Sequence, residues 1–147
     1  MNKITWITFA AISLIFGILI CKPLGCTPLR KDIPFVPRQE QFCLNAAKLI
    51  LFINASGYKC TFGETLRTKE QAQIYAKEHK GIVDSNHLYK LAVDLNLFKD
   101  GVYITDVKEY KQFADYCLTL NKNNEAGYYF KDKNGKQMFD SGHFEMD

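Results

Sequence analysis

The chain has 147 residues, which is enough for one compact domain with its own core. Hydrophobic residues make up 47% and charged residues 24% of the sequence, an ordinary globular mixture that excludes a disordered, collagen-like or coiled-coil protein. The net charge is +3, from 19 basic and 16 acidic residues. Residues 1–26 contain two lysines and no acidic residue, so the remaining chain has 17 basic and 16 acidic residues and a net charge of +1. Because binding to phosphates requires a basic surface, we expect no nucleic-acid partner.

The first predicted element is a hydrophobic helix near the N-terminus. Ile4–Cys21 is a stretch of 18 residues without a charge. As a helix it would be roughly 27 Å long, close to the thickness of a bilayer's hydrocarbon core. Residues 1–26 are therefore predicted to be a signal peptide or a membrane anchor, although neither Cys21 nor Cys26 lies in a convincing lipoprotein signal. Basic residues are more numerous after the stretch, which by the positive-inside rule alone would keep the C-terminal side in the cytoplasm.

A short linker is predicted to follow this helix. All four prolines lie between Lys22 and Gln39, and proline is unfavourable inside helices and stiffens extended chain. Residues 27–38 are therefore predicted to be a proline-rich tether, and the folded domain is expected to cover residues 39–147.

The first half of this domain is predicted to contain two helices and a strand. Apolar residues recur at helical spacing from Gln41 to Ile53, which predicts an amphipathic helix. Tyr58–Phe62 is predicted to be a short strand. Thr68 and the Lys-Glu-Gln that follows match a capping box, so a second helix is expected to begin after Thr68 and to end near His79.

The second half is predicted to contain a hairpin, a third helix and a final strand. Ala92–Phe98 alternates in polarity, and an Asp-Gly turn leads from it into Val102–Ile104, which is a hairpin signal. Asp106 is expected to cap a helix that ends near Leu120, and the Asn-, Lys- and Gly-rich stretch after it to be a loop or a short hairpin. Phe144–Met146 is the expected last strand. Interleaved helices and hairpin-linked strands predict a small α+β domain with an antiparallel sheet.

The cysteines do not form a recognisable metal or redox motif. There are five, an odd number, without a C-x-x-C pair, which disfavours a zinc ribbon or a thioredoxin-like site. Cys43, Cys60 and Cys117 lie among apolar neighbours and are predicted to be small buried residues. If the domain is exported, the alternative that two of them form a disulfide is left open.

The candidate chemistry depends on histidines and carboxylates. Of the three histidines, His87 and His143 are the candidate metal ligands. Two histidines and one carboxylate, here Asp94, make a sound catalytic zinc site, because three protein ligands leave the fourth position to water. Asp140 is the candidate general base that takes the proton of that water. The spacing of these residues does not prove a metal site. A histidine such as His87 is often only hydrogen-bonded, an aspartate such as Asp94 on a strand often faces solvent, and Asp140 in an Asp-Ser-Gly run is often a turn former.

Three motifs together resemble a known family. They are, in order, Ser85-x-His87, Ala92-x-Asp94 and Asp140-x-x-His143. This order is similar to the zinc-binding signature S-x-H-x-x-G-x-A-x-D followed by D/E-x-x-H of the VanY-like D-alanyl-D-alanine carboxypeptidases, the LAS metallopeptidases. The resemblance implies an α+β fold of the hedgehog and D,D-peptidase type, in which the sheet and flanking helices form a zinc cleft.

The resemblance extends over about Glu40–Met146. Gly63–Gln71 looks like the family's arginine-containing segment before a helix, and residues 95–101 look closest to the phage endolysins that cut L-alanyl-D-glutamate bonds. One position departs from the signature, because the glycine after the first histidine is Lys90 here. A glycine at that position suggests a tight backbone, so this substitution bears on local geometry or substrate fit.

The resemblance also implies a role for each site residue. His87, Asp94 and His143 would bind Zn²⁺, and Asp140 would be the general base. Arg67 would stabilise the carbonyl oxygen as it becomes an oxyanion.

Two further residues are expected around this centre. Ser85 is expected to contact substrate. Glu145 lies two residues past His143, so on a strand it would project to the same side and orient a metal ligand. His79 has no place in the signature and is expected to lie at a helix end.

The implied function is that of a zinc-dependent peptidoglycan peptidase acting on stem peptides. The first expectation is an L-alanyl-D-glutamate endopeptidase, as in endolysin-type cell-wall lysis. A D-alanyl-D-alanine carboxypeptidase or dipeptidase and a non-catalytic zinc-holding wall-binding module stay open, and residues 121–137 are expected to shape the cleft. The N-terminal segment is expected to contact a membrane, so the catalytic domain would be membrane-anchored or exported, on the periplasmic or cell-wall side.

Overall fold

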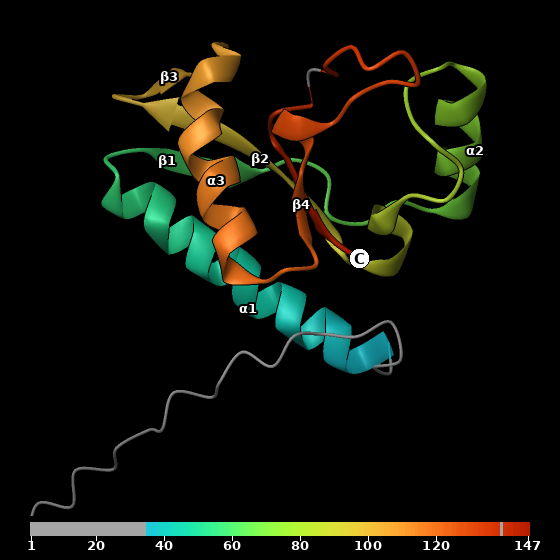
Figure 1. Ribbon diagram of the computed structural model, residues 1–147, viewed down its shortest axis with the longest axis horizontal. Helices are drawn as coiled ribbons and strands as arrows, with labels where there is room; N and C mark the ends of the chain where they lie inside the picture. The colour runs from blue at the N-terminus through green and yellow to red at the C-terminus, as the bar shows by residue number, and fades with distance from the viewer. Residues whose placement is uncertain (1–34, 139) are drawn as a thin grey trace, which may run out of the picture.

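The computed structural model describes residues 35–138 and 140–147 (Figure 1). The predictions for residues 1–26 and for most of the tether lie outside these ranges. No helix within them combines the length and hydropathy needed to span a bilayer. The described helices and strands are α1 (Phe35–Ala55), β1 (Lys59–Phe62), α2 (Lys69–Lys77), β2 (Ala92–Lys99), β3 (Val102–Tyr103), α3 (Lys111–Leu120), β4 (Asn124–Ala126) and β5 (His143–Met146), with 3₁₀ turns η1 (Asn86–Tyr89), η2 (Val107–Tyr110) and η3 (Gly127–Tyr129).

The strands form one antiparallel sheet. Its order is β1-β2-β5-β4, and β3 returns along β2 as a hairpin. Helices α1 and α3 lie together at one side of the molecule, whereas α2 stands apart at the opposite end (Figure 1). The predicted α+β class with an antiparallel sheet and flanking helices is confirmed.

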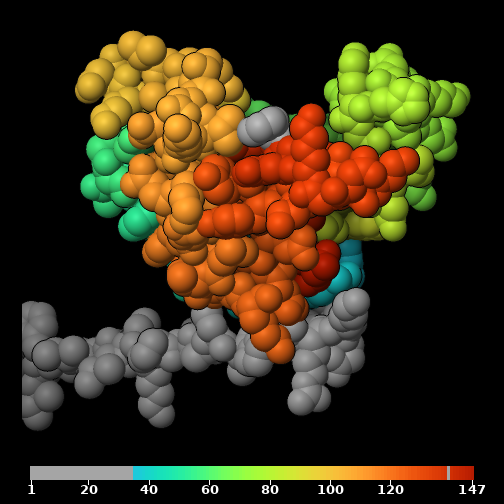
Figure 2. Space-filling model, turned by 45° about the horizontal axis from the view of Figure 1, so that its top comes forward, coloured from blue at the N-terminus to red at the C-terminus, as the bar shows by residue number. Residues whose placement is uncertain are grey.

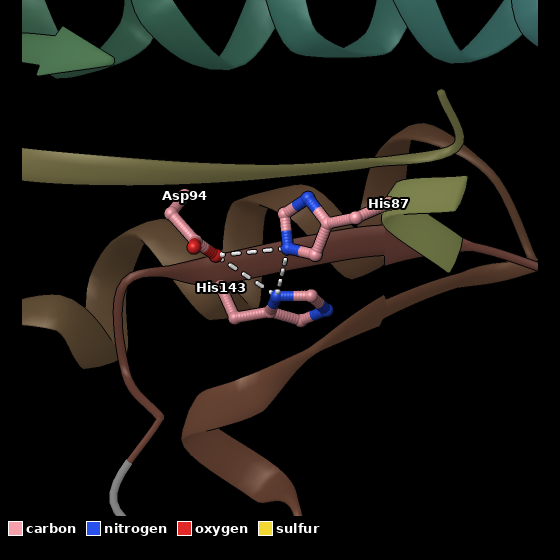
Figure 3. Close-up of side chains that lie close together, drawn as sticks. All are labelled: His87, Asp94 and His143. Atoms are coloured by element: carbon pink, nitrogen blue, oxygen red, sulfur yellow. Dashed lines mark hydrogen bonds and ion pairs between the residues drawn. The ribbon is translucent and has the colours of Figure 1, made fainter. Parts of the chain in front are cut away.

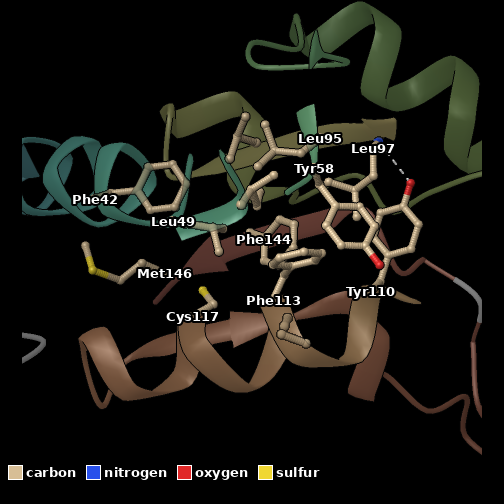
Figure 4. Packing of buried hydrophobic residues seen from close by; sticks show 14 of the residues in the cluster. Phe42, Leu49, Tyr58, Leu95, Leu97, Tyr110, Phe113, Cys117, Phe144 and Met146 are labelled. Atoms are coloured by element: carbon tan, nitrogen blue, oxygen red, sulfur yellow. Dashed lines mark hydrogen bonds between the residues drawn. The ribbon is translucent and has the colours of Figure 1, made fainter. Parts of the chain in front are cut away.

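The core lies between the sheet and the helices α1 and α3 (Figure 4). Leu95 and Leu97 of β2 and Phe144 of β5 are almost completely buried there. Phe113 of α3 packs edge-on against Tyr58, with ring centroids 5.2 Å apart. Burying an apolar side chain of this size stabilises a fold by roughly 1.5–3 kcal/mol. Since side chains alternate along a strand, the residues between these face the other side of the sheet, which is where the candidate ligands lie.

Helix α1 is longer than the sequence predicted. It begins at Phe35 instead of near Gln41, so the last residues of the expected tether are helical. Pro37 lies in the first turn, where a backbone N–H has no partner within the helix, so proline is tolerated there. The buried residues Phe42, Leu49 and Ile53 recur at helical spacing and carry the helix onto the core.

Helix α2 has the predicted start and a well-defined end. The Thr68 side chain accepts a hydrogen bond from the backbone N–H of Gln71, which confirms the cap. His79 follows the helix with a φ of 57°, and the N–H of Lys80 donates to the carbonyl of Tyr75 at 2.8 Å. This is a Schellman ending, so His79 lies at a helix end as expected.

The hairpin and the third helix are also where the sequence placed them. Asp100 and Gly101 both have positive φ, 52° and 79°, as a two-residue type I′ turn requires. The Asp106 side chain accepts a hydrogen bond from the N–H of Lys108, which confirms the cap. The helix is not uniform, because its first turn is the tighter η2 and the α-helical part starts only at Lys111.

The three cysteines of the described ranges are free thiols. Cys117 is buried, and burial raises its pKa to about 12. Cys60 is half-buried, but the prediction of a buried Cys43 is wrong, since this residue is exposed. It follows Phe42 on α1 and so points about 100° away from the buried stripe.

Candidate active site

Three candidate metal ligands meet on the face of the sheet away from the core. Asp94 lies on β2 and is directly opposite His143 on β5 in the antiparallel register. His87 lies in η1, shortly before β2. The three side chains point toward one another (Figure 3). The fold therefore brings together the three residues that the sequence suggested as ligands.

The distances within this group fit a zinc ion. His143 Nδ1 lies 2.9 Å from Asp94 Oδ1 and 3.2 Å from His87 Nε2, and His87 Nε2 lies 3.4 Å from Asp94 Oδ1. Around a tetrahedral zinc with bonds of 2.0–2.1 Å, neighbouring ligand atoms are about 3.3 Å apart. Two imidazole nitrogens and a carboxylate oxygen are also donors that catalytic zinc accepts. Within the described residues it is the one group of three or more such side chains placed to hold a metal.

Glu145 fixes the orientation of His143. Its Oε2 lies 2.9 Å from His143 Nε2, on the ring nitrogen that faces away from the group. A carboxylate only accepts hydrogen bonds, so Nε2 carries the proton and the neutral ring presents its Nδ1 lone pair to the metal position. The predicted position of Glu145 behind a ligand histidine matches this geometry.

The same contacts shift the pKa values of the metal-free group. Burial alone would lower the pKa of His143, but hydrogen bonds to Asp94 and Glu145 raise it to about 9. Burial would raise the pKa of Asp94, but hydrogen bonds to His143 and His87 hold it well below its usual range. Without a metal the group is therefore stabilised by a proton on His143, which a bound cation would replace.

His87 is held by the two ends of its short 3₁₀ turn. At the start, the Ser85 hydroxyl accepts a hydrogen bond of 3.4 Å from the His87 N–H. At the end, Lys90 has a φ of 56°, in the left-handed region where glycine is favoured, so the glycine of the family signature has a conformational reason. His87 is 1% exposed, and its Nδ1 has no hydrogen-bond partner among the described residues. Its Nε2 is thus the nitrogen directed at Asp94 and His143.

Ser85 has a structural role in this arrangement. It is 6% exposed and caps the turn that carries His87. Its predicted contact with substrate stays a prediction.

Arg67 lies beside the group and is firmly held. Its backbone N–H donates to the carbonyl of His87 at 3.3 Å, and its guanidinium lies over the ring of Tyr75, 4.9 Å from the centroid. The hydrogen bond to Glu64 raises the pKa of Arg67, and the charge of Asp94 raises it further, so the cation is within electrostatic reach of the metal group.

Glu64 is the residue whose importance the sequence did not reveal. Both of its carboxylate oxygens accept hydrogen bonds from Arg67 Nε, at 3.0 and 3.1 Å, and one also accepts from Nη2. Its carbonyl accepts from the N–H of Asp94 at 2.9 Å, so one residue contacts both the cation and a ligand strand. Opposite charges three residues apart are expected to pair when both lie on a helix. Glu64 and Arg67 lie outside any helix, so their spacing alone did not indicate this contact.

Asp140 lies in a pocket that also contains Asp94. The pocket has a volume of about 420 Å³ and extends from these two carboxylates to residues 103–110. Asp140 is exposed, yet partial desolvation of its carboxyl raises its pKa, and the charge of Asp94 raises it further. The structure therefore places the predicted base in the same pocket as a predicted ligand.

The backbone around Asp140 is closely packed. Its carbonyl accepts a hydrogen bond of 3.0 Å from the N–H of His143. A Cβ at Gly127 would lie 2.1 Å from that carbonyl oxygen, so the position tolerates only glycine. Gly127 belongs to η3, within the segment expected to shape the cleft, and that segment also contains β4 and an antiparallel bridge between Lys131 and Gln137. The predicted loop or short hairpin is found only around the Lys131–Gln137 bridge, because β4 is a strand of the main sheet that the sequence did not indicate.

Comparisons with known proteins bear on the fold. No protein-family model and no curated protein sequence matches the chain. The crystal structure of the Serratia marcescens L-Ala D-Glu endopeptidase ChiX is 19% identical, with a TM-score of 0.54 over 76% of this chain and 79% of that one. The chain has the fold of this peptidase.

A second solved structure has the same fold. It is a mutant of the vancomycin resistance D,D-pentapeptidase VanY, from a VanB-type resistance cassette, in complex with Zn(II). The identity is 19% and the TM-score 0.52, over 72% of this chain and 70% of that one. The VanY-like fold inferred from the signature residues is thus found independently by shape.

Proposed function

We propose that the protein is a zinc-dependent peptidoglycan peptidase that hydrolyses stem-peptide bonds. The observation that carries the proposal is the group of His87, Asp94 and His143, whose three ligand atoms have the mutual distances of a tetrahedral zinc site. The fold supports it, because the ChiX and VanY structures are of an L-Ala D-Glu endopeptidase and a D,D-pentapeptidase.

The residues around this group provide the rest of the chemistry. When bound, zinc would supply a Lewis acid that lowers the pKa of a coordinated water. Asp140 takes the proton of the attacking water and gives it to the leaving nitrogen, for which its raised pKa is suited. Arg67, held by Glu64, stabilises negative charge on the carbonyl oxygen. Glu145 keeps His143 in the ligating orientation.

The bond that we propose is the one between L-alanine and D-glutamate. Support comes from the endolysin-like residues after the ligand strand and from the likeness to the ChiX structure. A D-alanyl-D-alanine carboxypeptidase is the second candidate, supported by the likeness to the VanY structure. A zinc-holding wall-binding module would need neither Asp140 nor Arg67 beside the metal group, so their presence favours an enzyme.

We also propose that the domain acts outside the cytoplasm, anchored or exported through its N-terminal segment. The uncharged stretch Ile4–Cys21 supports this, and a peptidase with the proposed cell-wall substrate would need to act there.

Digestion of purified peptidoglycan tests the function. The full chain, purified in detergent, is incubated with and without zinc, and the released ends are read by mass spectrometry. New N-terminal D-glutamate is the expected product, whereas free D-alanine would transfer the assignment to the carboxypeptidase. An Asp140→Ala variant should keep its zinc and lose cleavage. A zinc-loaded, folded wild-type chain that releases no product would contradict the enzyme proposal.

A further inference from the structure

The pocket beside the metal group has an unusual charge for a peptidase that acts on acidic peptides. It is the cavity of about 420 Å³ that contains Asp94 and Asp140. Of the described residues that line it, none is Lys, Arg or His. Its other polar side chains are neutral and include Asn96, Thr105 and Ser141. With Asp94 engaged by a metal, Asp140 remains as the pocket's free charge, and this charge is negative.

The position of the general base decides which part of the substrate enters this pocket. The proton that Asp140 takes from water must reach the leaving nitrogen, so the residue that contributes this nitrogen lies next to Asp140. Arg67, which stabilises the carbonyl oxygen, does not line the pocket. It lies just before α2, and α2 and β3 are at opposite ends of the molecule (Figure 1).

The surface has the corresponding shape. Figure 2 shows one lobe near α2, a second lobe around β3 and the start of α3, and a depression between them. A peptide that crosses this depression would have its carbonyl side toward the α2 lobe and its amine side in the pocket.

We call the residue that contributes the scissile nitrogen the amine-side residue. In both candidate bonds, the carbon of this residue that is bonded to the nitrogen also carries a carboxylate. In an L-alanyl-γ-D-glutamyl peptide, the carbon bonded to the scissile nitrogen also carries the free α-carboxylate of D-glutamate; in a terminal D-alanyl-D-alanine it carries the terminal carboxylate. A carboxylate in this pocket would find no Lys, Arg or His side chain among the described lining residues to pair with, and it would be close to Asp140. A carboxamide there has no charge, and it can donate to and accept from neutral groups such as Asn96, Thr105 and Ser141.

We infer that the pocket selects stem peptides in which the α-carboxyl group of the amine-side residue is amidated. This inference rests on the proposed peptidase function and names its substrate class: a γ-linked D-glutamate whose α-carboxylate is a carboxamide. The same pocket disfavours release of a terminal D-alanine, since that product has an obligatory carboxylate beside the scissile nitrogen. A lining without a basic side chain among the described residues therefore separates the two candidate activities.

Two synthetic peptides that differ in one group test the inference. They are L-Ala-γ-D-Glu-L-Lys-D-Ala and the same peptide with a carboxamide in place of the α-carboxylate of D-glutamate. With the zinc-loaded full chain, kcat/KM should be about tenfold or more higher for the amidated peptide. Calorimetry should show tighter binding of the amidated amine-side product, a measurement that does not depend on turnover.

A charge placed in the pocket should reverse the preference. Thr105 is exposed and lines the pocket, so Thr105→Lys adds a cation there without disturbing the core. It should shift the ratio of the two kcat/KM values toward the carboxylate peptide by about tenfold. Thr119→Lys adds the same charge at an exposed position of α3 outside the pocket and should leave the ratio unchanged.

A failure of this inference can be distinguished from a failure of the proposed peptidase function. Cleavage of the two peptides at equal rates, or faster cleavage of the carboxylate form, would overturn the inference and leave the peptidase standing. A zinc-loaded chain that cleaves neither peptide nor peptidoglycan would overturn the proposed function and this inference with it. A Thr105→Lys variant that changes the ratio no more than Thr119→Lys would show that the pocket does not hold the amine-side residue.

Discussion

Asp94 and His143 occupy directly opposed positions on β2 and β5, and His143 Nδ1 lies 2.9 Å from Asp94 Oδ1. The next residue of each strand, Leu95 and Phe144, faces the core and is almost completely buried. A slip of one residue in either strand would expose one of these apolar side chains and bury a candidate ligand. Core packing therefore holds the register on which the metal group depends.

Glu145→Gln should weaken zinc binding by about 10–100-fold, because the amide orients His143 less firmly and lowers its basicity as a ligand. Competition with a chromophoric chelator measures this affinity. The matched control is Glu125→Gln, because Glu125 is paired directly with Glu145 on the neighbouring strand β4 and has no hydrogen bond to a ligand histidine. Equal losses of affinity in the two variants would show that general negative charge, and not the contact to His143, explains the effect.

The metal-free protein should lose stability as the pH rises from 6.5 to 9. Hydrogen bonds to Asp94 and Glu145 raise the pKa of His143 from 6.5 to about 9, so its stabilising contribution is complete below 6.5 and is lost as the pH rises through 9. The loss should be roughly 1–3 kcal/mol. Urea unfolding of the chelator-treated full chain at both pH values measures it.

Zinc should abolish this decline. A metal bound at Nδ1 requires the neutral imidazole, so its affinity increases over the same pH range. Over this range Asp94 is ionised throughout, because its pKa is held well below its usual range. A metal-free protein as stable at pH 9 as at pH 6.5 would contradict the protonated state assigned to His143.

Much of the fold could be predicted from local patterns. The caps at Thr68 and Asp106 and the turn at Asp100-Gly101 depend on residues adjacent in sequence, and the structure has all three. Helix α1 extends beyond its predicted start because Pro37 lies in the first turn, where it does not interrupt the helix.

The site was predictable only in part. The candidate ligands His87, Asp94 and His143 could be named from their motifs, but their meeting depends on the pairing of β2 with β5, which no local pattern determines. The contact of Glu64 with Arg67 depends on the path of a loop. The uncharged side of the pocket opposite Asp140 depends on how residues 103–110 fold back beside it. These features follow from tertiary structure.

Lys90→Gly should stabilise the protein relative to Lys90→Ala by about 1 kcal/mol, measured by urea unfolding of the zinc-loaded chain. Lys90 has a φ of 56° and a ψ of 34°, and a side chain with a Cβ costs about 1–2 kcal/mol in this left-handed conformation. The greater freedom of glycine in the unfolded chain offsets part of this gain. Alanine is the matched control because it keeps the Cβ. Equal stability of the two variants would mean that the turn relaxes when the lysine side chain is removed.

Glu64→Gln should lower kcat of the peptidase about tenfold and leave zinc affinity nearly unchanged. The carboxylate of Glu64 accepts hydrogen bonds from Arg67 Nε and Nη2, and a glutamine, with one oxygen and no charge, cannot hold the guanidinium in the same way. Because the role proposed for Arg67 is to stabilise charge that develops in the transition state, the change should appear in kcat more than in KM.

Glu78→Gln is the control for this variant, since it removes an exposed ion pair with Lys80 near the end of α2 and leaves Arg67 untouched. Steady-state kinetics and a zinc titration of the three proteins separate the possible causes. A loss of zinc in Glu64→Gln would mean that Glu64 supports the ligand strand through the contact between its carbonyl and the Asp94 N–H. An unchanged kcat would show that Tyr75 and the backbone alone hold Arg67 in place, and that Glu64 is not a positioning residue.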